Sequence, residues 1–210
     1  MPFSPRPLPY DVSALEPHFD EEWIASQRRW QEGYARQLDE LLAGTAWADL
    51  HAEALLRRLR ELPEDLRGPV GESAGGHLNH TLLFTGIGPD GGGEPGYELL
   101  DDIERDFGSF PAFQKAVSNA SAELVGEGWI WLVWNGQKLE LTSTELERNP
   151  LDRHHQPLLG IDLWEHAHER LFPDRAAYVE ALWHVVDWRV VAERFLEAEE
   201  VARGGPGVGG

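Results

Sequence analysis

The middle of the chain carries an eleven-residue stretch, GIGPDGGGEPG at residues 86–96, with glycine or proline at eight positions. Neither a helix nor a strand tolerates that composition in its interior, so the stretch predicts a loop that divides the chain. We expect an N-terminal domain over residues 1–86 and a C-terminal domain over residues 97–202, joined by residues 87–96 as a linker. The glycine-rich end, residues 203–210, predicts a flexible tail.

The first domain has the apolar spacing of helices. Asp20 is a suitable N-cap for a helix whose apolar residues follow over residues 23–41. Leucines over residues 47–62 predict a second helix that ends at Pro63, and residues 71–84 form a third apolar segment. Because the connection between the first two helices is short, we expect them to pair as an antiparallel hairpin.

The second domain mixes helical and strand patterns. Two helical segments, residues 97–107 and 110–124, precede the β-rich run WIWLVW, and an Asn-Gly pair then leads into an alternating segment. Two strands around Asn-Gly are a strong hairpin signal. Residues 158–161 predict a third strand, and residues 174–195 predict one long helix. The sequence therefore predicts an α+β protein: an antiparallel helical hairpin domain, then an α+β domain with a three-stranded antiparallel sheet.

Charge and composition exclude several classes of function. The 37 acidic residues outnumber the 18 basic ones, and the net charge of −19 argues against a nucleic-acid partner, which requires a basic surface. The absence of cysteine excludes disulfides, thiolate catalysis and iron–sulfur clusters. No apolar run reaches the length of a membrane span, and the first residues lack the apolar core of a signal peptide. We therefore expect a cytoplasmic protein without a membrane partner.

Two histidines and an aspartate are candidate metal ligands. Asp162 and His166 stand four residues apart just after the third predicted strand, and His80 lies in the third apolar segment. At that spacing the first two share one face if the segment is helical, and a mixed His and Asp set suits a transition metal. A single histidine among apolar neighbours is more often a hydrogen-bonded core residue, so these residues alone leave both interpretations open.

Five motifs in the same order resemble the iron/manganese superoxide dismutases. They are LPYDVSALEPHFD, GGHLNHTLLF, GEGWIWLVWNG, DLWEHAHERLF and AAYVEALWHVVDWRVVAERF, and the resemblance covers residues 7–196. It implies dismutation of superoxide to oxygen and hydrogen peroxide at a mononuclear manganese or iron site. It also implies a homodimer with one ion per subunit.

The resemblance implies only three of the family's four ligands. The family holds its metal with three histidines and one aspartate, and His80, Asp162 and His166 match three of these positions. The first histidine is missing, because Ser26 or Gln27 occupies its position on the opening helix. The metal is then expected to bind more weakly or to be absent.

The resemblance also assigns residues around the metal. Tyr34 matches the family's active-site tyrosine, and Glu147 stands where the family has a glutamine that hydrogen-bonds the metal-bound solvent. Gly76 is expected to leave room for the Glu147 side chain. Glu165 matches the glutamate that reaches across the dimer to the ligand histidine of the other subunit. The remaining matches form the aromatic wall of the pocket: Trp129 and Trp131.

The missing histidine leaves several hypotheses open. Glu147 can replace the lost ligand, since iron and manganese accept carboxylate oxygen, and we favour this over a role beside the metal. A second hypothesis is a different redox reaction at a site of two histidines and one carboxylate, with open positions. A third is a metal-free dimeric scaffold without dismutase activity.

Overall fold

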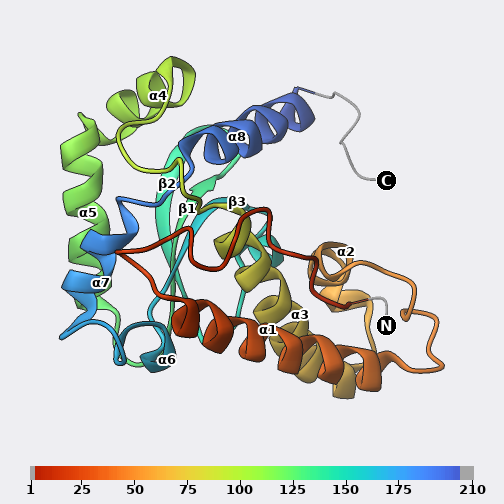
Figure 1. Cartoon of the computed structure of the whole chain (residues 1–210). Helices are drawn as coiled ribbons and strands as arrows, with labels where there is room; N and C mark the ends of the chain where they lie inside the picture. Colours follow the sequence, from red (N-terminus) through yellow and green to blue (C-terminus); the bar gives the residue numbers. More distant parts are fainter. Residues whose placement is uncertain (1–2, 204–210) are drawn as a thin grey trace.

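The computed structural model describes residues 3–203. Of the tail predicted over residues 203–210, residues 204–210 lie outside the described part. Figure 1 shows a helical region around α1 and α3 beside a three-stranded sheet with further helices around it. The predicted α+β class, with a helical hairpin followed by an α+β domain, is confirmed.

The helical hairpin pairs α1 (Glu21–Leu42) with α3 (Glu64–Thr85), which lie side by side in Figure 1. The side chain of Asp20 caps α1 by accepting a hydrogen bond of 2.8 Å from the Trp23 amide, as the sequence predicts.

The partner of α1 in this hairpin differs from the sequence prediction. The helix expected over residues 47–62 is only the short α2 (Ala52–Arg57) and a 3-10 turn, η1 (Leu59–Glu61). The long helix begins after Pro63 and continues through Pro69. Pro69 is exposed, whereas Gly75 and Gly76 of the same helix lie against neighbouring elements.

Two glycines of α3 allow that close packing. A Cβ atom on Gly75 would lie 1.8 Å from the backbone oxygen of Glu147, and one on Gly76 would lie 2.4 Å from the ring of Tyr34. The atoms nearest to the Gly76 position belong to the Tyr34 ring, and the expected role of Gly76 beside the Glu147 side chain stays a prediction. Gly75 is the residue that admits the Glu147 segment, through its backbone.

The sheet contains β1 (Gly128–Trp134), β2 (Leu139–Glu145) and β3 (Gln156–Asp162), in the antiparallel order β2-β1-β3. The predicted Asn-Gly turn joins β1 to β2, where the Asn135 side chain accepts hydrogen bonds from two following amides. The pairing of β1 with β3 sets Trp129 opposite Asp162 at the end of the sheet. A side chain at the last residue of β3 therefore meets the aromatic residues of β1.

Five helices accompany the sheet: α4 (Tyr97–Phe107), α5 (Phe110–Glu123), α6 (Glu165–His168), α7 (Arg175–Leu182) and α8 (Trp188–Ala202), with a 3-10 turn, η2 (Pro150–Arg153). The single long helix predicted over residues 174–195 is divided into α7 and α8. The backbone between them bonds instead to the glycine-rich loop, through Gly88 to Val185 and Asp187 to Gly86. Asp187 then caps α8.

Two apolar clusters hold the fold together. The larger joins the sheet to α4, α5, α7, α8 and the start of α1, and the smaller lies between α1, α2 and α3. The ends of β1 and β3 meet α1 and α3 between these clusters, and the candidate site lies there. Within residues 3–203, no helix is long and apolar enough to cross a membrane.

The Gly75 contact gives a stability prediction. Gly75→Ala should lower the free energy of unfolding by about 1–3 kcal/mol, because the added methyl group meets a backbone oxygen that cannot rotate away. Gly33→Ala on α1 is the matched control, since nothing lies within 4 Å of its Cβ position, and it should stabilise the protein by up to about 1 kcal/mol. Urea unfolding followed by circular dichroism measures both. Equal stabilities for the two variants would contradict the close approach.

Candidate metal centre

Three side chains from three elements converge below the sheet. His80 comes from α3, Asp162 ends β3, and His166 lies on the short α6. Asp162 Oδ2 lies 3.9 Å from His80 Nε2 and 3.4 Å from His166 Nε2, and the three atoms lie within 4.8 Å of one another. One ion can contact all three after small side-chain adjustments. The structure thus brings together the three residues that the sequence proposed as ligands.

The other polar atoms of this group are held by the backbone. His80 Nδ1 donates to the Gly76 carbonyl at 2.8 Å, and Asp162 Oδ1 accepts from the Trp164 amide at 3.0 Å. These bonds leave His80 Nε2 and Asp162 Oδ2 directed at the common point. Burial lowers the pKa of His80, which favours the neutral imidazole that a metal requires.

The converging atoms have no protein partner. In the part of the chain that the structure describes, His80 Nε2, Asp162 Oδ2 and His166 Nε2 are buried and make no hydrogen bond. Each unsatisfied buried polar group costs about 1–3 kcal/mol, and more when it is charged. A cation bound among them removes this cost, and two imidazoles with a carboxylate suit iron or manganese. The residues present therefore fit the metal that the resemblance implies.

One face of α1 covers this group. Trp23 Nε1 donates to the carbonyl of Ala167 at 2.8 Å, and the Trp30 ring stacks on His166 with centroids 4.8 Å apart. Tyr34, one helical turn further on, has its ring centroid 6.0 Å from that of His80.

Gln27 lies on the same side of α1 and is one of the two residues that the resemblance places at the missing ligand position. Gln27 is fully buried, and its Nε2 donates to the His166 carbonyl at 3.2 Å, whereas Ser26 is partly exposed. Gln27 Oε1 is buried and has no hydrogen-bond partner within residues 3–203. Sequence reasoning dismissed this position because it holds no histidine, and it missed the free amide oxygen.

Glu147 lies beside the group, with its carboxylate already bonded. Oε1 accepts from the Tyr34 hydroxyl at 3.1 Å, and Oε2 accepts from Asn79 and Trp129, each at 3.0 Å. Among the described residues, its oxygens do not belong to the set of atoms within 4.8 Å of one another. Burial, aided by the negative charge of Asp162, raises the pKa of Glu147 well above the usual range. Burial also raises the pKa of Tyr34.

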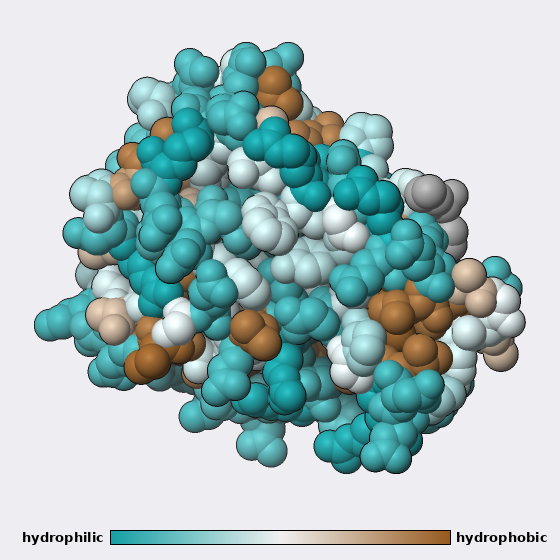
Figure 2. All heavy atoms as spheres, turned by 90° about the horizontal axis from the view of Figure 1, so that it is seen from below, coloured by the Kyte–Doolittle hydropathy of each residue, from teal (hydrophilic) through white to brown (hydrophobic). Residues whose placement is uncertain are grey.

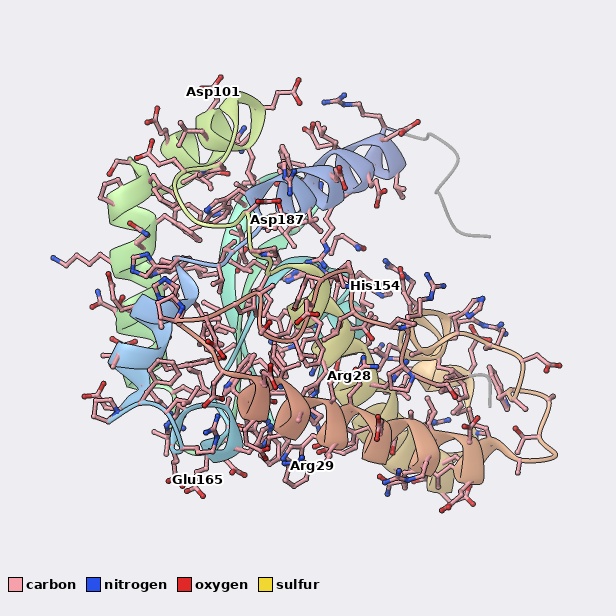
Figure 3. All side chains as sticks on the ribbon, viewed as in Figure 1. Arg28, Arg29, Asp101, His154, Glu165 and Asp187 are labelled. Atoms are coloured by element: carbon pink, nitrogen blue, oxygen red, sulfur yellow. The ribbon has the colours of Figure 1, made fainter. Side chains whose placement is uncertain are left out.

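The aromatic residues of β1 close the site on the sheet side. Trp129 and Trp131 are buried and stack with centroids 5.3 Å apart, and Trp129 meets the His80 ring edge to face. Glu165, by contrast, is exposed at the start of α6 (Figure 3). Trp129 and Trp131 therefore form a buried wall of the site, whereas the Glu165 carboxylate is exposed.

The raised pKa of Glu147 gives a pH prediction for metal-free protein. As pH rises, the unfolded chain loses this proton first, so the free energy of unfolding should fall between the usual range of a glutamate and the raised pKa of the folded state. Glu147→Gln removes the titration and should flatten that part of the profile. Its amide can still accept from Trp129 and Asn79. Chemical unfolding at a series of pH values checks this, and parallel profiles for the two proteins would contradict the buried titration.

Comparisons with known proteins identify the family of this chain. The family models described as iron/manganese superoxide dismutases match the chain twice: the alpha-hairpin domain over residues 2–88 and the C-terminal domain over residues 95–194. The manganese superoxide dismutase of Listeria monocytogenes is 40% identical over 195 residues, which is 91% of this chain and 96% of the relative. The Mn/Fe superoxide dismutase of Methylomonas sp. (strain J) is similar to the same extent. The manganese enzyme of Pseudomonas aeruginosa is 39% identical over 94% of this chain and 99% of its own length. The chain therefore belongs to the iron/manganese superoxide dismutase family.

Proposed function

We propose that this protein dismutates superoxide to oxygen and hydrogen peroxide, with one manganese or iron ion held by His80, Asp162 and His166. The observation that carries the proposal is the convergence of three buried donor atoms that no described protein group satisfies. In a metal-free scaffold all three atoms would remain without a hydrogen-bond partner, and no bound cation would offset the free-energy cost of burying them. The same observation therefore disfavours the scaffold hypothesis.

The reaction needs electrons from the metal and protons from the protein. A manganese or iron ion held by His80, Asp162 and His166 would supply the one-electron redox chemistry that oxidises one superoxide and reduces another. Two protons complete each molecule of peroxide, and the Tyr34–Glu147 hydrogen bond lies next to the site that consumes them. Burial raises the pKa of Tyr34, so its hydroxyl stays protonated, and this pair holds a proton at Tyr34 Oη next to the site.

The surrounding residues restrict access to the site. Trp129 and Trp131 exclude water on the side of the sheet, and Trp30 covers His166 on the side of α1. This dry surrounding strengthens the attraction of a bound cation for an anionic substrate, which the net charge of −19 would otherwise repel. The local site, rather than the charge of the whole chain, is what makes superoxide a suitable substrate.

We place Glu147 beside the metal rather than among its ligands. Three donors already converge on its carboxylate, and these hydrogen bonds direct it toward Tyr34, Asn79 and Trp129. Glu147→Gln should therefore leave the metal content unchanged.

A variant of Asp162 tests the site directly. Asp162→Asn retains an oxygen for the Trp164 amide but removes the negative charge, so the metal content and the dismutase activity should fall together, by at least about tenfold. Elemental analysis and a superoxide assay on protein expressed with added manganese and iron measure both. A wild-type protein that holds a full equivalent of metal but shows no dismutase activity would support the different redox reaction instead.

We further propose that the protein is a homodimer joined through the face that carries Glu165. Glu165 and Arg29 lie on the same lower side of the molecule in Figure 3, and Trp30, the next residue after Arg29 in the chain, is 45% exposed. This face, seen in Figure 2, is mostly hydrophilic with paler residues near its middle. In the dimer, Glu165 should accept a hydrogen bond from His166 of the partner subunit and thereby orient that ligand.

The dimer gives a second test. Glu165→Ala should weaken the dimer and reduce metal retention together, because one side chain would support both. Multi-angle light scattering at micromolar concentration and elemental analysis measure the two effects. Asp101→Ala, at an exposed residue of α4 on the upper side of the molecule in Figure 3, is the control and should change neither. A wild-type protein that is monomeric under these conditions would contradict the proposed interface.

A further inference from the structure

We infer that Gln27 supplies a fourth protein ligand to the metal through its amide oxygen, Oε1. This inference rests on the proposed metal site and concerns how that site compensates for the histidine it lacks. It changes the ligand set from two histidines and one carboxylate with open positions to two nitrogens and two oxygens.

The first observation is that Gln27 is a buried amide with only half of its hydrogen-bonding capacity used. Its side chain is 0% exposed, and Oε1 has no partner among the described residues. An amide oxygen in this condition costs about 1–3 kcal/mol, which a bound cation would recover. The converging donors of His80, Asp162 and His166 are in the same condition.

The second observation is that the amide is fixed in orientation. Nε2 donates to the His166 carbonyl at 3.2 Å, which identifies the nitrogen end and leaves the oxygen end free. This bond ties Gln27 to the turn of α6 that carries one of the proposed ligands. The side chain is therefore held in place before any ion binds, which lowers the entropy cost of ligation.

The third observation is the helical face on which Gln27 lies. Trp23, Gln27, Trp30 and Tyr34 follow one another at spacings of three or four residues, so they share one side of α1. The other three contact α6, His166 or His80. Gln27 is buried on this side of α1 and bonds to the His166 carbonyl, so its side chain lies against the turn that carries His166.

The competing replacements have weaker support. Ser26 lies on the same side of α1, three residues after Trp23 and four before Trp30, but it is partly exposed, and its hydroxyl on a single methylene group reaches less far than the amide oxygen of Gln27. Both oxygens of Glu147 accept hydrogen bonds from protein donors, whereas Gln27 Oε1 accepts none within residues 3–203.

The chemistry of the substitution affects the choice of metal. An amide oxygen is neutral, as imidazole is, so the replacement leaves the charge of the ligand set unchanged. It exchanges a nitrogen donor for a harder oxygen donor, and carbonyl oxygen suits manganese better than imidazole does. The site should therefore favour manganese over iron more strongly than a site with three histidines.

The test compares two glutamines of the same helix. Gln27→Leu removes Oε1 and keeps the size and burial of the side chain. Gln31→Leu is the matched control, because Gln31 is also buried on α1 but its Oε1 already accepts from Arg28 at 2.9 Å. Metal-free full-length wild type and both variants are titrated with Mn²⁺ alone and followed by electron paramagnetic resonance, with circular dichroism to confirm folding.

We expect Gln27→Leu to raise the dissociation constant for Mn²⁺ at least about tenfold and to change the spectrum of the bound ion. Gln31→Leu should change neither, although it loses stability. Gln27→His should restore binding and reduce the preference for manganese over iron in a competition between the two metals. If Gln27→Leu does not fold, Gln27→Asn shortens the side chain by one methylene group and should show the same loss.

Two outcomes would overturn the inference, and they differ in what else they affect. If wild type binds one equivalent of Mn²⁺ and dismutates superoxide, and Gln27→Leu binds with the same affinity and spectrum, the ligand role is wrong and the proposed function stands. If wild type fails to bind one equivalent of Mn²⁺ or iron, the proposed function falls as well.

Discussion

The close approach of α3 to the segment around Glu147 is the contact on which the rest of the site depends. Gly75 and Gly76 lack the side chains that would hold the segment and Tyr34 away. The next turn of the same helix carries Asn79, which bonds Glu147, and His80, which Gly76 orients through its carbonyl. One helical segment therefore sets the positions of a proposed ligand and of the hydrogen bonds beside it.

Two buried carboxylates, Asp162 and Glu147, then explain why the site requires a cation. Asp162 and Glu147 lie close enough that the charge of Asp162 raises the pKa of Glu147, and the pocket around them is apolar and aromatic. The two differ in how they are satisfied: Glu147 accepts three hydrogen bonds from protein donors, whereas one oxygen of Asp162 accepts none within residues 3–203. A cation beside Asp162 stabilises both, because it supplies the positive charge that the described protein groups do not.

The sequence predicted the fold well where the signals are local. The strands around Asn135-Gly136, the helices α4 and α5 and the caps at Asp20 and Asp174 depend on residues within a few positions of one another. Predictions were wrong where distant contacts override the local pattern. Residues 47–62 predict one helix beside α1, yet this segment is divided into α2 and η1, and α3 is the helix that packs along α1. The interruption between α7 and α8 arises because that backbone bonds to the glycine-rich loop about a hundred residues earlier.

The sequence by itself determined the family and the α+β class, because both follow from motifs and their order. The same motifs singled out His80, Asp162 and His166 as candidate metal ligands. Only the tertiary structure decided which atoms converge and which are already satisfied. Glu147 and Gln27 are both polar residues at altered positions, and nothing in the sequence distinguishes a bonded carboxylate from a free amide oxygen. The reason is physical: hydrogen-bond satisfaction depends on donors from Tyr34, Asn79 and Trp129, or on their absence, and these lie on separate elements that meet only in the folded chain.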